Sequence, residues 1–241
     1  MEFKRILKKV ISYLIPSRIA VFLSECVRPV YSFFDVKSFS QEGEDLILER
    51  LFEGKNWGIY VDVGAHHPYR YSNTFKFYLK GWRGVNIDAM PGSMDLFNKW
   101  RPRDFNIEAA ISEEKEILCF YIFNDLALNT FDETVVKLYD NDKYFRVIEK
   151  KEIETKKLSD VLENSLRNSE QIDFMSIDVE GLDLDVLHSN DWQRFKPLVI
   201  LIEILNVASI IDVQDHEIYI YLTSKGYKLF SRTVNTFIFK L

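Results

Sequence analysis

Short apolar runs separated by amphipathic segments make up most of the chain from residue 38 onward. The runs at 58–65 and 84–91 are too short for helices and carry an acidic residue near the carboxyl end, which is typical of buried parallel strands. Further strands are predicted at 105–111, 117–123, 172–181, 198–203, 227–232 and 235–241. Apolar residues recur at helical spacing in 41–53, 75–82, 184–187 and 215–224. Strands that alternate with helices predict a mostly parallel sheet covered on both faces.

Residues 1–37 are predicted to form a basic helical extension, followed by one α/β domain over residues 38–241. Residues 1–34 hold six basic and two acidic side chains, and their apolar residues recur at helical spacing with lysines on the other face. The pattern is typical of a helix on an anionic membrane surface, but a helix packed on the domain or on a second copy fits equally well. Pro16 and Arg18 interrupt the apolar stretch, so neither a membrane-spanning helix nor a secretory signal is expected. We expect a cytoplasmic protein, with peripheral contact at the inner membrane face as an open alternative.

Composition narrows the class of protein further. The chain has 241 residues, of which 47% are apolar and 28% charged, so it has ample material for one folded domain with an appendage. Its net charge of −6 argues against a general nucleic-acid binder. Cys26 and Cys119 can form at most one disulfide, and no CxxC motif or Cys/His cluster that could hold structural zinc occurs, which favours a reducing compartment.

The turn after the first predicted strand restricts the ligands of the sheet. Parallel sheets bind ligands beyond the carboxyl ends of their strands, where the strand order reverses. After Gly64 the chain lacks the further glycines of a dinucleotide-binding turn, and no G-x-x-x-x-G-K-[ST] motif occurs. Asp88 ends the second strand, where a carboxylate commonly accepts both ribose hydroxyls. This combination favours a nucleoside without phosphates, such as S-adenosylmethionine. The Asp and Glu residues at the carboxyl ends of the strands would attract its cationic groups. An ordinary strand-to-helix turn is the alternative for Asp62 and Gly64.

Six blocks of sequence stand out between residues 38 and 205. They are SQEGEDLIL (40–48), YVDVGAHHPYRYSNT (60–74), GWRGVNIDAMPGSMDLF (81–97), RPRDFNIEAAIS (101–112), LNTF (128–131) and IDFMSIDVEGLDLDVL (172–187). In this order and spacing they resemble the FkbM family of S-adenosylmethionine-dependent methyltransferases. The resemblance implies a class I methyltransferase Rossmann-like fold, with a seven-stranded sheet whose last strand is antiparallel. It also implies methyl transfer to a hydroxyl oxygen, and a sugar acceptor because members are often found with genes for sugars, surface glycans or natural products.

The resemblance also assigns residues to the cofactor. The methionine and ribose part of the cofactor would be lined by Asp62, Gly64 and Ala65. Asp88 would bind the ribose hydroxyls, and Ala109 would face the adenine. The methionine carboxylate needs donors, which the helix start around Asn73 or the guanidinium of Arg70 would supply. Gln41 and Asp45 are candidates to close over the cofactor, with helix capping and a surface charge as the alternatives.

Removal of the acceptor proton needs a base near the transferred methyl group. Asp178 is the first candidate, because it ends the strand expected beside the one that bears Asp62. His67, or less favourably His66, is the alternative, since imidazole titrates nearest to neutral pH.

Asp178, Glu180 and Glu203 follow neighbouring predicted strands and together offer the oxygen ligands that Mg²⁺ prefers. A metal at Asp178 and Glu203 is therefore one hypothesis. The alternatives are that Glu180 starts a helix and that Glu203 binds substrate or caps a turn.

Asn129 and Thr130 either contact the acceptor or form a turn. The charged segment 137–157 is predicted to be a solvated hairpin or lid, with a basic substrate-facing rim as the alternative. For the aromatic stretch Tyr69–Tyr71, core packing is preferred over a sugar-stacking wall.

Two other functions remain open at this point. The chain could be a cofactor-binding or scaffold module of a glycan-assembly complex, or a nicotinamide-dependent sugar oxidoreductase, which the turn after Gly64 disfavours.

Overall fold

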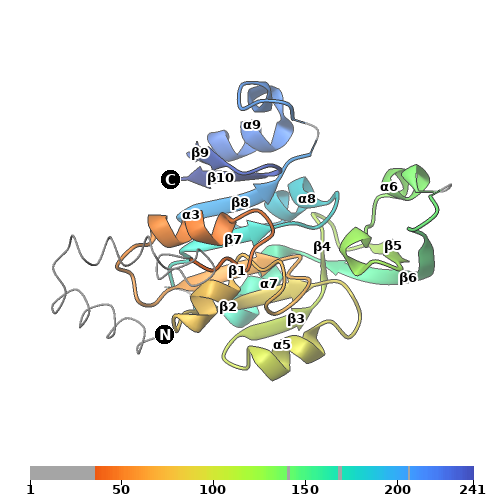
Figure 1. Cartoon of the computed structure of the whole chain (residues 1–241), viewed down its shortest axis with the longest axis horizontal. Coiled ribbons are helices and arrows are strands. Elements are labelled where there is room, and N and C mark those ends of the chain that lie inside the picture. The colour runs from red at the N-terminus through yellow and green to blue at the C-terminus, as the bar shows by residue number, and fades with distance from the viewer. Residues whose placement is uncertain (1–35, 140–141, 168–169, 206) are drawn as a thin grey trace, which may run out of the picture. The chain divides into compact units, whose positions relative to one another are not determined.

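The computed structural model describes residues 36–139, 142–167, 170–205 and 207–241 (Figure 1). The chain divides into two units, residues 1–37 and residues 38–241. The helix predicted within residues 1–34 lies outside the described residues. In the described part of the chain, every helix is too short or too polar to cross a bilayer.

Seven strands form the central sheet in the order β3-β2-β1-β7-β8-β10-β9 (Figure 1). Their bounds are Phe105–Glu108 (β3), Arg83–Asp88 (β2), Ile59–Val63 (β1), Phe174–Ile177 (β7), Val199–Glu203 (β8), Thr236–Lys240 (β10) and Lys228–Arg232 (β9). Strands β3, β2, β1, β7 and β8 pair in parallel, and β10 runs antiparallel to both of its neighbours. This confirms the predicted seven-stranded sheet with an antiparallel last strand. The order reverses between β1 and β7, which is where such sheets bind ligands.

Helices cover both faces of the sheet because side chains alternate along each strand. The helices are α3 (Glu44–Leu51), α4 (Phe75–Leu79), α5 (Met94–Trp100), α6 (Glu133–Leu138), α7 (Leu158–Ser165), α8 (Asp183–His188) and α9 (Glu217–Ser224), with 3₁₀ turns η2 (Leu126–Leu128) and η3 (Asp212–Asp215). Val61 of β1 packs in the same core as Leu162 of α7 and Leu222 of α9. Its neighbour Tyr60 faces the other way, into a core that includes Phe77 of α4. The prediction of helices on both faces is confirmed.

A hairpin projects beside the central sheet (Figure 1). Its strands β5 (Ile117–Phe123) and β6 (Val147–Lys156) are antiparallel, and β6 also pairs in parallel with the short β4 (Ala110–Ile111). The segment 137–157 does not by itself form the predicted hairpin, but supplies the end of α6 and one strand, β6, which pairs with the separately predicted strand β5. The single strand predicted over 105–111 is wrong, because the chain leaves the central sheet at Ala109 and pairs with β6 instead.

The first helix begins later than predicted. The helix predicted over 41–53 begins only at Glu44 (α3), after Gly43, whose φ of 89° is left-handed. The Ser40 hydroxyl donates to Asp45 Oδ1 at 3.1 Å and accepts from Asp45 N at 3.3 Å. The segment before α3 is thus tied to the first turn of the helix by a side chain.

Candidate active site

A cavity of about 750 Å³ opens at the carboxyl ends of β1, β2, β3 and β7. The ends of β1 and β2 are joined because Gly64 N and Ala65 N both donate to Ile87 O, at 2.9 and 3.0 Å. Asp178 N donates to Val63 O at 3.0 Å, which joins β7 to β1 in the same way. The volume lies in the range of about 300–1,000 Å³ that is usual for small-molecule sites. The cavity therefore occupies the position where a parallel sheet of this topology binds its ligand.

Gly64 is the residue that lets β1 and β7 meet at this edge. Its φ is 81°, and a Cβ there would lie 1.7 Å from Asp178 O. Any side chain would push the loop after β7 away from β1. The glycine turn predicted from the sequence is thus needed for the close approach of the two strand ends.

Asp88 holds two loops of the cavity through its carboxylate. Oδ2 accepts from His66 N and Oδ1 accepts from Met90 N, both at 2.8 Å. Burial raises the pKa of Asp88 above its ordinary value, although the two backbone donors act in the opposite direction. Each oxygen keeps a lone pair for a further donor. Asp88 lines the cavity, so a diol such as that of ribose can approach it.

Three residues in left-handed backbone conformations surround the cavity. Among the described residues other than glycine, only His66, Tyr71 and Glu180 have positive φ, at 51°, 54° and 52°. All three line the cavity. Such conformations cost roughly 1–3 kcal/mol each and concentrate at functional sites. The strain supports this cavity as the active site.

The two histidines of the loop after β1 are neutral at pH 7. Burial lowers the pKa of both His66 and His67. His67 Nδ1 accepts from Tyr69 N at 3.3 Å and from Arg70 N at 3.2 Å. A neutral ring whose Nδ1 accepts carries its proton on Nε2, so His67 is better placed to donate a hydrogen bond than to take a proton.

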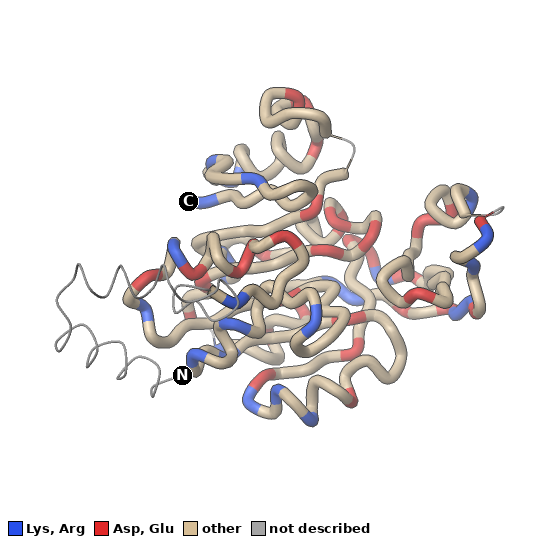
Figure 2. Tube along the Cα trace, viewed as in Figure 1, with Lys and Arg blue, Asp and Glu red and all other residues tan. Residues whose placement is uncertain are grey.

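Three carboxylates come together beyond β7 and β8, as the sequence predicts. Oxygen atoms of Asp178, Glu180 and Glu203 lie within 4.8 Å of one another. Figure 2 shows the distribution of the described acidic positions along the chain in red. Burial, with the neighbouring negative charges, raises the pKa of Glu180 to about 8 and that of Glu203 to about 7. The pKa of Asp178 is raised well above its usual range, by burial first and then by Glu203. Asp178 is also exposed to the cavity, where water screens part of this repulsion.

This cluster makes stability depend on pH. A carboxyl group whose pKa is higher in the folded than in the unfolded state stabilises the fold while it is protonated, and this contribution is lost as the pH rises through the folded pKa. We expect the thermal midpoint, measured with EDTA present, to fall between about pH 5 and about pH 8. In Glu203→Gln the fall should be shallower. An equal fall in the variant would show that the cluster is not responsible.

The β5–β6 hairpin forms the wall of the cavity opposite the sheet. Thr130 Oγ1 donates to Glu180 O at 2.7 Å, and Asn129 Oδ1 accepts from Phe123 N at 2.9 Å. Asn129 Nδ2 also contacts Met90 Sδ at 3.6 Å. The LNTF block therefore fastens the hairpin to the loops after β2 and β7. Asn129 lines the cavity, whereas Thr130 is 1% exposed and does not.

Some of the residues predicted for the site line the cavity. They are Gln41, Gly64, His66, His67, Arg70, Asp88, Ala109, Asn129, Asp178 and Glu180. Asp62 is buried and accepts from Thr74 Oγ1 at 2.6 Å, and Ala65 packs beside Phe97.

Further predicted residues lie outside the cavity lining and have partners within the fold. The carboxylate of Asp45 accepts from Ser38 Oγ at 2.7 Å and Phe39 N at 2.8 Å. Asn73 Nδ2 donates to Ser176 Oγ at 3.0 Å. Glu203 also lies outside the lining and reaches the site through its contact with Asp178 and Glu180.

Other lining residues were not predicted from the sequence. The hairpin and the turns within it supply seven of them: Phe120, Asn124, Asp125, Leu126, Ala127, Phe131 and Phe145. No motif signals these positions, because the wall forms only when β5, η2 and the start of β6 come together. The charge density of 137–157 indicated a lid, but not which residues would face the ligand.

Solved structures and a family model resemble the chain. A proposed caffeoyl-CoA O-methyltransferase from Staphylococcus aureus aligns at 12% identity and a TM-score of 0.44, over 100% of both chains. An O-methyltransferase from Bacillus cereus in complex with SAH aligns at 15% identity and a TM-score of 0.37, over 96% of this chain and 94% of that one. A search of curated proteins found no match. The model described as the methyltransferase FkbM domain matches residues 62–229. Since this match covers well over half of the chain, the chain belongs to the FkbM family of S-adenosylmethionine-dependent methyltransferases.

Proposed function

We propose that the chain is an O-methyltransferase that acts on a hydroxyl group of a sugar, in a surface glycan, a glycolipid or a related metabolite. Methyl transfer is the reaction indicated by membership of the FkbM family. The observation that supports a hydroxyl as the methyl acceptor is the position of Asp178. This residue lies at the end of β7, lines the cavity and has a raised pKa. A hydroxyl is a weak nucleophile and needs such a proton acceptor.

The residues of the cavity fit S-adenosylmethionine. Asp88 offers the two oxygens that a ribose diol requires, and Gly64 keeps the strand ends close together. The exposed guanidinium of Arg70 lines the cavity and is suited to the methionine carboxylate. When bound, the cofactor supplies a methyl group that its sulfonium has already activated.

Asp178 is assigned as the base that removes the proton of the acceptor hydroxyl. Burial and, after it, the neighbouring carboxylates raise the pKa of Asp178, which makes its anion a stronger base. The Nε2–H of His67 is available to hold an acceptor oxygen. Proton transfer to a positioned base contributes roughly 10²–10⁴ in rate, and alignment of the reacting atoms contributes more.

Exposed aromatic side chains beside the cavity support a sugar acceptor. Tyr71 lines the cavity and is 48% exposed, whereas Tyr69 (43% exposed) and Trp100 (52% exposed) lie outside the lining, Tyr69 on the same loop as Tyr71. The rings of Tyr69 and Trp100 lie edge to face at 5.9 Å. The preference for core packing of Tyr69 and Tyr71 is therefore wrong. Rings that combine an apolar face with a polar edge suit the mixed surface of a sugar.

A divalent cation is the second way in which the same carboxylates could activate a hydroxyl. Asp178, Glu180 and Glu203 are close enough to share an ion, and Mg²⁺ prefers such ligands. We expect the base mechanism, so activity should persist after treatment with EDTA. Activity that EDTA abolishes and Mg²⁺ restores would assign the cluster to a metal instead.

Transfer of labelled methyl groups tests the function. Purified protein, labelled S-adenosylmethionine and fractionated cell-envelope glycans of the source organism should give labelled glycan with one added methyl group by mass. Binding of the cofactor without transfer to any fraction would favour the non-catalytic module. A fluorescence titration with NADH addresses the oxidoreductase, which should show no binding because the turn after Gly64 has no pyrophosphate cradle.

A further inference from the structure

We propose that Arg101 is a positioning residue of the cofactor site: its buried guanidinium fixes the loop between β1 and α4 on which His66, His67, Arg70 and Tyr71 line the cavity. The inference rests on the proposed function, since it assumes that this cavity binds the cofactor. Arg101 itself does not line the cavity.

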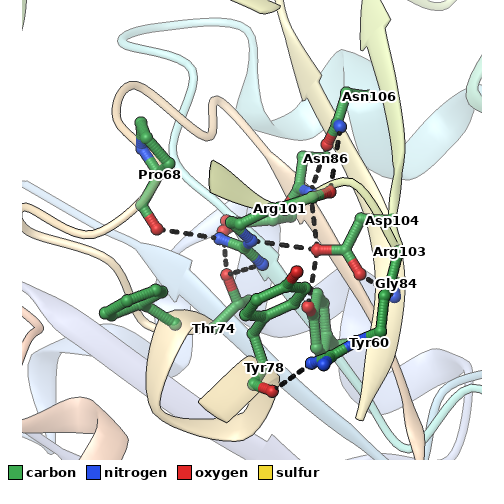
Figure 3. Close-up of polar contacts among 12 residues, drawn as sticks. Tyr60, Pro68, Thr74, Tyr78, Gly84, Asn86, Arg101, Arg103, Asp104 and Asn106 are labelled. Carbon is green, nitrogen blue, oxygen red and sulfur yellow. Dashed lines mark hydrogen bonds and ion pairs between the residues drawn. The ribbon is translucent and has the colours of Figure 1, made fainter. Parts of the chain in front are cut away.

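Arg101 follows α5 and is 0% exposed, which is unusual for an arginine. Its Nε donates to Asp104 Oδ2 at 2.9 Å in a buried ion pair (Figure 3). Breaking such a pair on one side usually costs about 3–5 kcal/mol, because a buried charge is left without its partner. The pair therefore holds the guanidinium at a fixed place within the fold.

Asp104 connects the guanidinium to the central sheet (Figure 3). It accepts from Tyr60 OH of β1 at 2.7 Å and from Gly84 N of β2 at 2.9 Å. Asn86 Nδ2 of β2 donates to it as well, at 3.0 Å. One end of the network is thus anchored to the two strands whose carboxyl ends border the cavity.

The other end of the guanidinium holds the loop. Nη2 donates to Thr74 Oγ1 at 2.9 Å, and Nη1 lies 3.4 Å from Pro68 O and 3.5 Å from Ser72 Oγ. Thr74 Oγ1 in turn donates to Asp62 Oδ2 at 2.6 Å. These contacts lie on both sides of Arg70 and Tyr71, two of the cavity-lining residues of the loop, and Pro68 directly follows the other two, His66 and His67.

The bracketed segment is held in a strained conformation. Tyr71 lies between Pro68 and Ser72 and has a left-handed φ of 54°. A non-glycine residue keeps such a conformation only where the surrounding contacts enforce it. Contacts from one guanidinium to both sides of Tyr71 supply that enforcement, so losing them should let the loop relax away from its cavity-lining shape.

A lysine could not replace this arrangement. The guanidinium carries donors in a planar fork, and it also lies 5.2 Å from the ring centroid of Tyr60 and 5.4 Å from that of Phe97. An ammonium is a point charge on a flexible stem and does not present the same directed donors. Arg101→Lys therefore keeps the buried charge and removes the fork.

Calorimetric titration with S-adenosylhomocysteine tests the proposal. We expect Arg101→Lys to raise Kd by about 10-fold or more with unchanged stoichiometry, since loss of hydrogen bonds of about 1.4 kcal/mol in total corresponds to that factor. The matched control is Arg103→Lys, because Arg103 packs on the ring of Tyr78 and donates to its carbonyl but does not contact the loop. Kd should stay within about twofold in that variant.

A merely structural role predicts a different result. Partial unfolding would lower the stoichiometry and leave Kd of the folded fraction unchanged, and this outcome, or a wild-type Kd, would overturn the proposal. Failure of the wild type to bind would instead refute the proposed function.

Thr74→Val provides a second variant in case Arg101→Lys does not fold. It removes the hydroxyl that accepts from Arg101 and donates to Asp62, and it leaves the Arg101–Asp104 pair in place. Kd should rise here too, by about three- to tenfold. If both variants fold, the double variant should bind only slightly more weakly than Arg101→Lys, because Arg101→Lys already removes the directed hydrogen bond to Thr74 and the second change adds only the loss of the Thr74–Asp62 bond. Fully multiplicative effects, or a wild-type Kd in Thr74→Val, would contradict the proposal.

Discussion

Asp88→Ala is expected to weaken S-adenosylhomocysteine binding by about 100-fold or more, from the loss of charge-assisted hydrogen bonds of roughly 1.5–3 kcal/mol each. The substitution removes the acceptor for the ribose hydroxyls. It also releases His66 N and Met90 N, which the carboxylate holds at 2.8 Å on either side of the cavity. Calorimetry with purified protein measures the effect directly.

Asp95→Ala is the matched control for this experiment. Asp95 is an exposed acid on α5 outside the cavity lining, so its removal changes the net charge equally without touching the site. Its Kd should stay within about twofold of the wild type. If Asp88→Ala also binds normally, the ribose does not lie at the end of β2.

Asp178→Asn is expected to lower kcat by roughly 10²–10⁴ while the affinity for S-adenosylhomocysteine changes little. The amide keeps the shape of the side chain but cannot take the acceptor proton. In the wild type, kcat/KM should rise with pH as the carboxyl group loses its proton, because the anion is the active form and its pKa lies well above the usual range. The variant should lose this rise.

His67→Asn tests the rival base. The Asn side-chain oxygen can take the place of Nδ1, which accepts from Tyr69 N and Arg70 N, so the loop should keep its shape. We expect a loss of kcat below about tenfold, because His67 is assigned a donor rather than a proton acceptor. A large loss in His67→Asn together with a small loss in Asp178→Asn would reverse the two roles.

Most strands of the central sheet and the edge that carries the site are predictable from the sequence. Each central strand is an apolar run bounded by turn residues, and the acids at its carboxyl end mark the edge where the ligand binds. Asp88, Asp178 and Glu180 were found in this way, because a parallel sheet brings its strand ends together. Short helices such as α5 and α7 were not predicted, since a segment of two turns gives little periodic signal.

Long-range polar contacts could not be predicted. Arg101 lies in a charged block, RPRD, that is typical of a surface, and its partner Thr74 is 27 residues away along the chain. Asp62 was expected to line the cofactor site, but its carboxylate is buried outside the cavity lining and accepts from Thr74. Tyr71 and Glu180 adopt left-handed conformations that local propensity disfavours. In each case the decisive contact joins segments that only the tertiary fold brings together.

A crystal structure of the protein with S-adenosylhomocysteine is the most direct test of the central claim that the cavity at the ends of β1, β2 and β7 is the methyl-transfer site. We expect both ribose hydroxyls within hydrogen-bond distance of Asp88 and the sulfur directed toward Asp178. A ligand bound elsewhere, or a ribose that does not reach Asp88, would contradict the account.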